Sequence, residues 1–63
     1  MLTNSDIGIY DVVILQDGRE GTVVDIYDMP GLPIGYEIEI SKTRMELETV
    51  EIDKIQKVIA KAH

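Results

Sequence analysis

The stretch YDVVILQDGREGTVVDI, residues Tyr10–Ile26, determines the fold of this chain. Two runs of mostly β-branched residues flank the segment Asp17–Gly21. In this segment, Gly18 and Gly21 enclose Arg19-Glu20. Valine and isoleucine favour extended strands, whereas glycine reaches positive φ in a tight turn without a Cβ clash. We therefore expect an antiparallel hairpin whose turn is built on two glycines, with strands at Tyr10–Leu15 and Thr22–Tyr27.

The second of these strands does not alternate cleanly between apolar and polar residues. Val23, Val24 and Ile26 are all apolar. This pattern predicts either a β-bulge or a strand that is buried on both faces.

The connection Asp28–Gly35, DMPGLPIG, combines turn residues with large apolar residues. Pro30-Gly31 suits the two central positions of a type II turn, and Pro33 argues against a regular central strand. The connection carries three large apolar side chains: Met29, Leu32 and Ile34. Either they fold back as a lid over the end of a barrel, or they form a surface for self-association or for a partner.

Two further strands, Tyr36–Ile40 and Met45–Thr49, alternate strictly between apolar or small residues and glutamates. A turn at Ser41–Arg44 that sets Ile40 opposite Met45 also sets the glutamates in facing pairs on one outer face. These pairs are Glu37 with Glu48 and Glu39 with Glu46. Like charges in facing positions destabilise a sheet. We therefore expect basic side chains to reach over them, or a basic partner or a cation to meet them.

The segment after Val50 fits two interpretations. Apolar residues recur in it at helical spacing, at Ile52, Ile55, Ile59 and Ala62. Alternatively, Glu51–Ile55 forms a single 3-10 turn that is followed by a closing strand, Gln56–Ala60. We favour the turn and strand, because a four-stranded sheet needs a fifth strand to cover an open edge.

The length of 63 residues allows one domain, which we divide into a lead-in, residues 1–9, and a barrel domain, residues 10–63. The sequence contains no cysteine, which excludes disulfides, thiolate zinc sites and cysteine nucleophiles. Because His63 is the single histidine, we expect neither a metal site nor a cofactor. A core this small is usually stabilised further, and association with another chain is the remaining means.

No segment approaches the roughly 20 apolar residues of a membrane span. The N-terminus, MLTNSDIGI, lacks the basic and long apolar regions of a signal peptide. We therefore expect a cytoplasmic protein that makes no contact with membranes.

The net charge of −6 is unevenly distributed. Residues 1–40 contain eight acidic residues and one base, Arg19, whereas residues 41–63 contain four acidic residues and five bases. Nucleic-acid binding depends on neutralising phosphates with lysine and arginine, so the acidic part of the chain disfavours it. A basic or neutral protein partner fits this charge better.

The chain resembles KOW-like modules in its first half. The residues that carry this resemblance are Asp11-Val12-Val13, the glycines Gly18 and Gly21 that flank Arg19-Glu20, and Thr22-Val23-Val24. Its continuation, Tyr36–Ile40 and Glu51–Ile55, is similar to a family of small bacterial single-domain proteins of unknown function. The resemblance implies an all-β fold, a small five-stranded SH3-like barrel with a short 3-10 turn before the last strand.

KOW-like modules typically contact RNA, ribosomal proteins or transcription proteins through basic residues, and the first 40 residues here offer only Arg19. The aromatic groove of peptide-binding SH3 domains is also missing, since Tyr10, Tyr27 and Tyr36 are the only aromatic residues. The aspartates Asp11, Asp25 and Asp53 lack a paired group in a cleft, so we expect no catalytic residue.

The leading hypothesis is a noncatalytic interaction module whose acidic surface binds a protein partner or a second copy, as in an antitoxin or an immunity protein. The candidate surface consists of Met29, Leu32, Ile34, Glu37, Glu39, Glu46 and Glu48. One alternative is a KOW-like accessory of nucleic acid or the ribosome. Another is a noncatalytic subunit that completes a larger enzyme.

Overall fold

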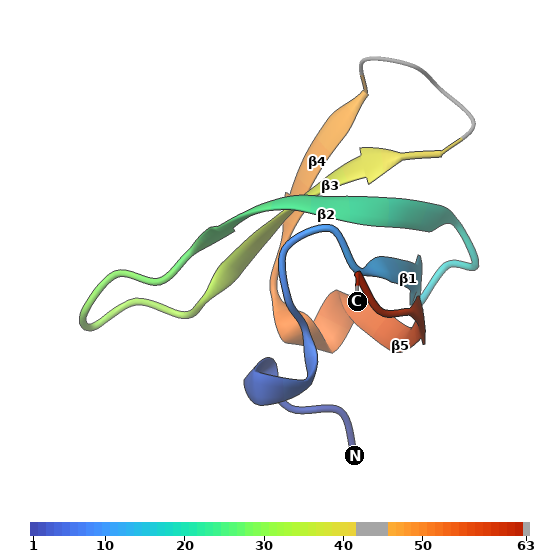
Figure 1. Cartoon of the computed structure of the whole chain (residues 1–63). Helices are drawn as coiled ribbons and strands as arrows, with labels where there is room; N and C mark the ends of the chain where they lie inside the picture. The colour runs from blue at the N-terminus through green and yellow to red at the C-terminus, as the bar shows by residue number, and fades with distance from the viewer. Residues whose placement is uncertain (42–45, 63) are drawn as a thin grey trace.

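Five antiparallel strands form one sheet in the computed structural model, which describes residues 1–41 and 46–62 (Figure 1). The strands are β1 (Val12–Leu15), β2 (Glu20–Tyr27), β3 (Gly35–Ile40), β4 (Leu47–Val50) and β5 (Ile55–Ala60). They lie in the order β4-β3-β2-β1-β5. Two 3-10 turns complete this part of the chain, η1 (Asn4–Asp6) and η2 (Ile52–Lys54).

The predicted all-β fold with five strands and a 3-10 turn before the last strand is confirmed. The helical interpretation of the C-terminal segment is wrong, because η2 leads directly into β5, which pairs with β1. The sheet does not close into a barrel. Over the described residues, β4 and β5 form its two edges.

The turn between β1 and β2 uses one glycine where two were predicted. Gly18 has a φ of 93°. The N–H of Gly18 donates to the carbonyl of Leu15 over 2.9 Å, and the N–H of Leu15 donates to the carbonyl of Arg19 over 2.8 Å. Gly21 lies inside β2 and pairs with Val13. Gly21 therefore takes no part in the turn, and its missing side chain allows β2 to pack closely against β3.

The bulge predicted in the second strand is present. Val23 pairs with Ile38 and Asp25 pairs with Glu37, so that Val24 is an extra residue on β2. An extra residue bends a strand and increases its twist. The bulge lies near the middle of β2, which is the central strand of the sheet (Figure 1).

The predicted turn at Pro30-Gly31 is also confirmed. Gly31 has a φ of 80°, and the N–H of Leu32 donates to the carbonyl of Met29 over 3.1 Å. Proline presets φ at the first central position and glycine allows the positive φ at the second. This turn fixes the tip of the connection between β2 and β3.

The register between β3 and β4 differs by one residue from the predicted register. Glu39 pairs with Leu47, and Ile38 pairs with Glu48. A shift of one residue exchanges the two faces of a strand. Leu47 is therefore 52% exposed on the outer face, and Glu48 lies on the face of the core. The predicted strand start at Met45 and most of the Ser41–Arg44 turn lie outside the described residues.

The cause of this register is Val50, which was not included in the predicted strand. Val50 pairs with Tyr36, and both side chains are buried. Val50 has the same phase in the strand as Glu48, so burying Val50 turns Leu47 outward. The free energy gained by burying Val50 against the core exceeds the cost of placing the half-exposed Glu48 on the same face of the strand.

The core lies on the inner face of the bent sheet. It contains nine buried apolar side chains among the described residues: Ile7, Val13, Leu15, Val23, Tyr36, Ile38, Ile40, Val50 and Ile55. The lead-in contributes to it, because Ile7 is buried and the Tyr36 hydroxyl donates to Asn4 Oδ1 over 2.6 Å. Ile9, by contrast, is 39% exposed.

Tyr10 has a backbone φ of 71°, and the residue is 65% exposed. Left-handed backbone costs a residue with a Cβ about 1–2 kcal/mol. We expect Tyr10→Gly to be more stable than Tyr10→Ala by about 1 kcal/mol, because both variants lose the ring and only glycine relieves the backbone. Urea unfolding followed by circular dichroism measures this difference. Equal stabilities would contradict the strain.

Candidate functional site

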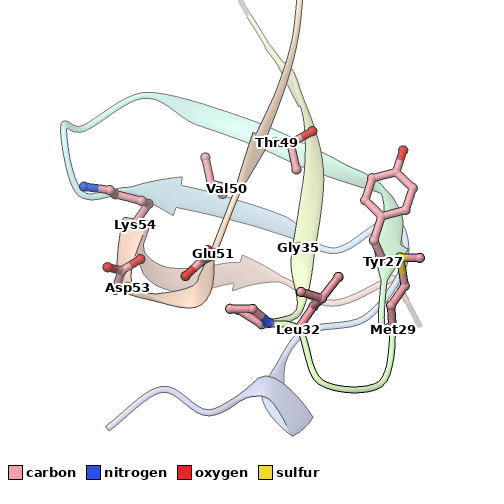
Figure 2. A pocket seen from close by; sticks show the side chains of 10 residues that line it. Tyr27, Met29, Leu32, Gly35, Thr49, Val50, Glu51, Asp53 and Lys54 are labelled. Atoms are coloured by element: carbon pink, nitrogen blue, oxygen red, sulfur yellow. The ribbon is translucent and has the colours of Figure 1, made fainter.

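A groove lies at the end of the sheet where β2 and β3 are joined (Figure 2). We call it the end groove. It has a volume of about 570 Å³ and lies between the β2–β3 connection and the segment from β4 to η2. Its apolar wall is formed by Tyr27, Met29, Leu32 and Pro33, and its opposite wall by Thr49, Val50, Glu51, Asp53 and Lys54.

The apolar wall is open to solvent. Met29 is 56% exposed, Leu32 is 61% exposed and Tyr27 is 41% exposed. Ile34 behaves differently, since it is partly buried against the core. The lid interpretation therefore holds for Ile34 alone, and the interpretation as a partner surface stays a prediction for Met29 and Leu32. Ile34 folds back onto the core, whereas Met29 and Leu32 face outward.

Gly35 lies between the two walls and leaves a hollow there (Figure 2). A Cβ at this position would lie 3.4 Å from Thr49 Cγ2 and 3.8 Å from Tyr27 Cδ2. These distances lie within the range of ordinary contact, so a methyl group here would touch both walls without displacing either of them. The absence of a side chain at Gly35 is what keeps the groove open between Tyr27 and Thr49.

The Tyr27 ring is held in place by a carboxylate on the next strand. The Tyr27 hydroxyl donates to Glu37 Oε1. This hydrogen bond raises the pKa of Tyr27 to about 12, with burial and the charge of Glu37 adding to the effect. The phenol is protonated at neutral pH and can donate this hydrogen bond. One wall of the end groove is thus preformed.

The facing pairs that the sequence predicts among the four glutamates of the candidate surface are not present. Glu37 pairs with Thr49 and Glu39 pairs with Leu47, both on the outer face. Glu48 lies on the other face, and Glu46 precedes β4 and is exposed. The structure therefore brings Met29 and Leu32 together with Glu37, through Tyr27, and leaves the other three glutamates outside the end groove.

Glu48 is part of an ion-pair network at the opposite end of β4. Arg19 Nη1 and Nη2 donate to the two carboxylate oxygens of Glu48 over 2.9 and 3.0 Å. Arg19 Nε donates to Asp17 Oδ2 over 2.7 Å. Hydrogen bonds from Arg19 lower the pKa of Glu48, and both carboxylates raise the pKa of Arg19. The bidentate pair ties the β1–β2 turn to β4.

Asp11 is buried and connects both ends of the chain to β1. Its side chain accepts hydrogen bonds from Gly8 N over 2.8 Å, Lys61 Nζ over 2.6 Å and Ala62 N over 2.9 Å. Burial alone would raise the pKa of Asp11, but these donors outweigh it and the pKa is lowered. All three donors come from the protein itself, so the carboxylate has a structural role.

The candidate surface predicted from the sequence includes only Met29 and Leu32 of the ten lining residues, and it lacks, among others, Tyr27, Gly35, Glu51 and Asp53. The available signal was their position. Tyr27 and Gly35 flank the apolar connection and pair with each other once Pro30-Gly31 closes its tip. Glu51 and Asp53 belong to the 3-10 segment, which the sequence placed correctly along the chain but not in space.

Two features are absent from the part of the chain that the structure describes. No helix there is long and apolar enough to cross a membrane. No group of three or more acidic or histidine side chains in residues 1–41 and 46–62 is placed to hold a metal ion. Comparisons with models of protein families, with curated proteins and with solved structures each find no significant match to this chain.

Proposed function

We propose that this chain is a noncatalytic interaction module of the cytoplasm that binds a partner protein through the end groove. The observation that carries the proposal is the exposure of Met29 and Leu32, each more than half exposed on a connection with a fixed turn. Large apolar side chains grouped on a surface are typical of contacts between proteins. Tyr27 adds an aromatic side chain of the type that contributes strongly to such contacts.

The charge around the end groove indicates a basic partner. The acidic residues at or next to the groove are Asp25, Asp28, Glu37, Glu51 and Asp53, and Lys54 is the base in its lining. An acidic surface attracts a basic partner and accelerates the encounter. A second copy would bring the same acidic surface, so we place a different, basic protein ahead of self-association. An antitoxin or immunity role, or a subunit of a larger enzyme, would use the same groove.

Two of the four bases among the described residues are engaged in ion pairs, which supports a protein partner over a nucleic acid. Arg19 is bound to Asp17 and Glu48, and Lys61 is bound to the buried Asp11. A base that already neutralises a carboxylate contributes less to phosphate binding, which depends on the release of counterions from the nucleic acid. The KOW-like resemblance therefore bears on the shape of the chain more than on RNA.

We expect Leu32→Asp, and likewise Met29→Asp, to abolish co-purification of the partner at native expression levels while leaving the fold intact. A carboxylate at this position adds charge and removes apolar contact area from the interface. Quantitative mass spectrometry of the purified complexes measures the loss.

Leu47→Asp is the matched control for this experiment. Leu47 is 52% exposed, which is close to the 61% of Leu32, and it lies outside the end groove. We expect Leu47→Asp to retain the partner. The proposal is wrong if Leu32→Asp and Met29→Asp retain the partner as well as the wild type does. It is also wrong if Leu47→Asp loses the partner equally.

A further inference from the structure

We infer that the end groove receives one aliphatic side chain of the partner in the hollow over Gly35, and that a lysine or arginine next to it in the partner sequence meets Glu51 and Asp53. The inference rests on the proposed function and specifies the chemistry of the segment that binds. Three features of the groove carry it.

The first feature is the hollow over Gly35. A carbon atom at the Cβ position of residue 35 would lie at contact distance from Thr49 Cγ2 and from Tyr27 Cδ2, at 3.4 and 3.8 Å. A partner group cannot take that bonded position, but an aliphatic group seated above Gly35 in the groove is bordered by the same two neighbours, a methyl group and an aromatic ring. Neither of these neighbours offers it a charge, so the hollow suits an apolar group.

The second feature is the preformed wall. Tyr27 is fixed by its hydrogen bond to Glu37, and the loop that carries Met29 and Leu32 is closed by the Met29–Leu32 backbone hydrogen bond. A rigid site loses little conformational entropy when a ligand binds. The order of the Tyr27 ring and of the loop backbone before binding therefore lowers the entropic cost of binding here.

The third feature is the charge of the opposite wall. Glu51 and Asp53 line it together with Lys54, so carboxylates outnumber ammonium groups there (Figure 2). The two walls face each other across the groove, with apolar side chains on one and these charged side chains on the other. A segment that presents an aliphatic residue beside a lysine or arginine matches both walls at once. The net charge of −6 disfavours a second copy as this segment.

The test begins with a phage-displayed library of short random peptides, selected on the wild-type protein and eluted from it. We expect the selected peptides to carry an aliphatic residue next to lysine or arginine. The strongest of them becomes the probe, and its dissociation constant is measured by fluorescence anisotropy. Selected peptides without basic residues would overturn the inference.

The decisive variant is Gly35→Ala, which places a methyl group in the hollow. It should fold, because its Cβ meets only ordinary contacts and residue 35 has no positive φ. We expect it to weaken binding of the probe peptide by about tenfold or more, since a single methyl group in a fitted pocket has an effect of this order. Gly8→Ala is the control, because Gly8 lies outside the groove and its Cβ would lie 3.6 Å from Asp11 Oδ2. It should leave probe binding unchanged.

Comparison with Leu32→Asp separates this inference from the proposed function. If Leu32→Asp abolishes probe binding and Gly35→Ala leaves it unchanged, the groove binds proteins but the hollow is not its specificity site. If the probe binds Leu32→Asp as tightly as it binds the wild type, both the proposed function and the inference are wrong. Urea unfolding of each variant confirms that a loss of binding is not a loss of fold.

Discussion

Replacing Asp11 with alanine is expected to lower the free energy of unfolding by about 3 kcal/mol, since it removes a buried, charged hydrogen-bond acceptor and leaves its donors without a partner. The N–H groups of Gly8 and Ala62 both donate to this carboxylate. A domain of this size has a small total stability, so such a loss unfolds a large fraction of the molecules. Urea unfolding at neutral pH, followed by far-ultraviolet circular dichroism, measures the change.

The pH dependence of the free energy of unfolding separates the contribution of the Asp11 charge from that of the side chain's shape. The folded state lowers the pKa of Asp11, so its carboxylate contributes stability that is fully present above the unfolded pKa of about 3.9. This stability is lost as the pH falls through the folded pKa. The stability difference between the wild type and Asp11→Asn should therefore shrink below about pH 4. A difference that is the same at neutral and acidic pH would contradict this role.

Gly21→Ala is expected to lower the free energy of unfolding by about 3 kcal/mol, because the core has no room for a methyl group at this position. The added Cβ would lie 2.3 Å from Ile38 Cγ2 and 2.9 Å from the carbonyl oxygen of Glu39. Ile38 is fully buried and Glu39 contributes backbone, so neither can move away without displacing β3 from β2. The urea midpoint measures the effect.

Gly35→Ala provides the matched control for this prediction. It introduces the same chemical change at another strand position of the same hairpin, where the nearest atom would lie 3.4 Å away. We expect its free energy of unfolding to stay within about 1 kcal/mol of the wild type. Equal losses in the two variants would show that the cost arises from the backbone of glycine and not from close packing at Gly21.

The strands and turns could be predicted from the sequence because their signals are local. Turn residues at Gly18 and at Pro30-Gly31 mark two chain reversals, and β-branched runs between such signals form strands. The bulge at Val24 was visible as an interruption of the alternation. Each of these features depends on neighbouring residues along the chain, and the sequence states these directly.

The register of β3 with β4 could not be predicted in this way. The alternating strand Met45–Thr49 fits the sheet in either phase, with Leu47 or with Val50 toward the core. The choice depends on contacts across the sheet, where Val50 meets Tyr36, and on Arg19, which reaches Glu48 from a distant turn. Interactions of this range leave no trace in a local pattern.

The end groove was predicted only in part for a related reason. Met29 and Leu32 were recognisable as apolar residues in a connection, whereas Gly35 resembles an ordinary strand start. Its importance comes from the side chains of Tyr27 and Thr49 on the neighbouring strands. The same holds for Asp11, whose donors Lys61 and Ala62 lie at the other end of the chain. The sequence shows the residue types, and the fold shows which of them meet.

Photo-crosslinking from inside the end groove tests most directly whether a protein partner binds there. A photoreactive phenylalanine analogue is placed at Leu32 in one strain and at Leu47 in another, since both side chains are more than half exposed and only Leu32 lines the groove. After irradiation of cells at native expression, we predict one reproducible adduct with a basic protein from position 32 and none from position 47. The absence of an adduct at position 32, or the same adducts from both positions, would contradict the proposal that this chain binds a protein partner through the end groove.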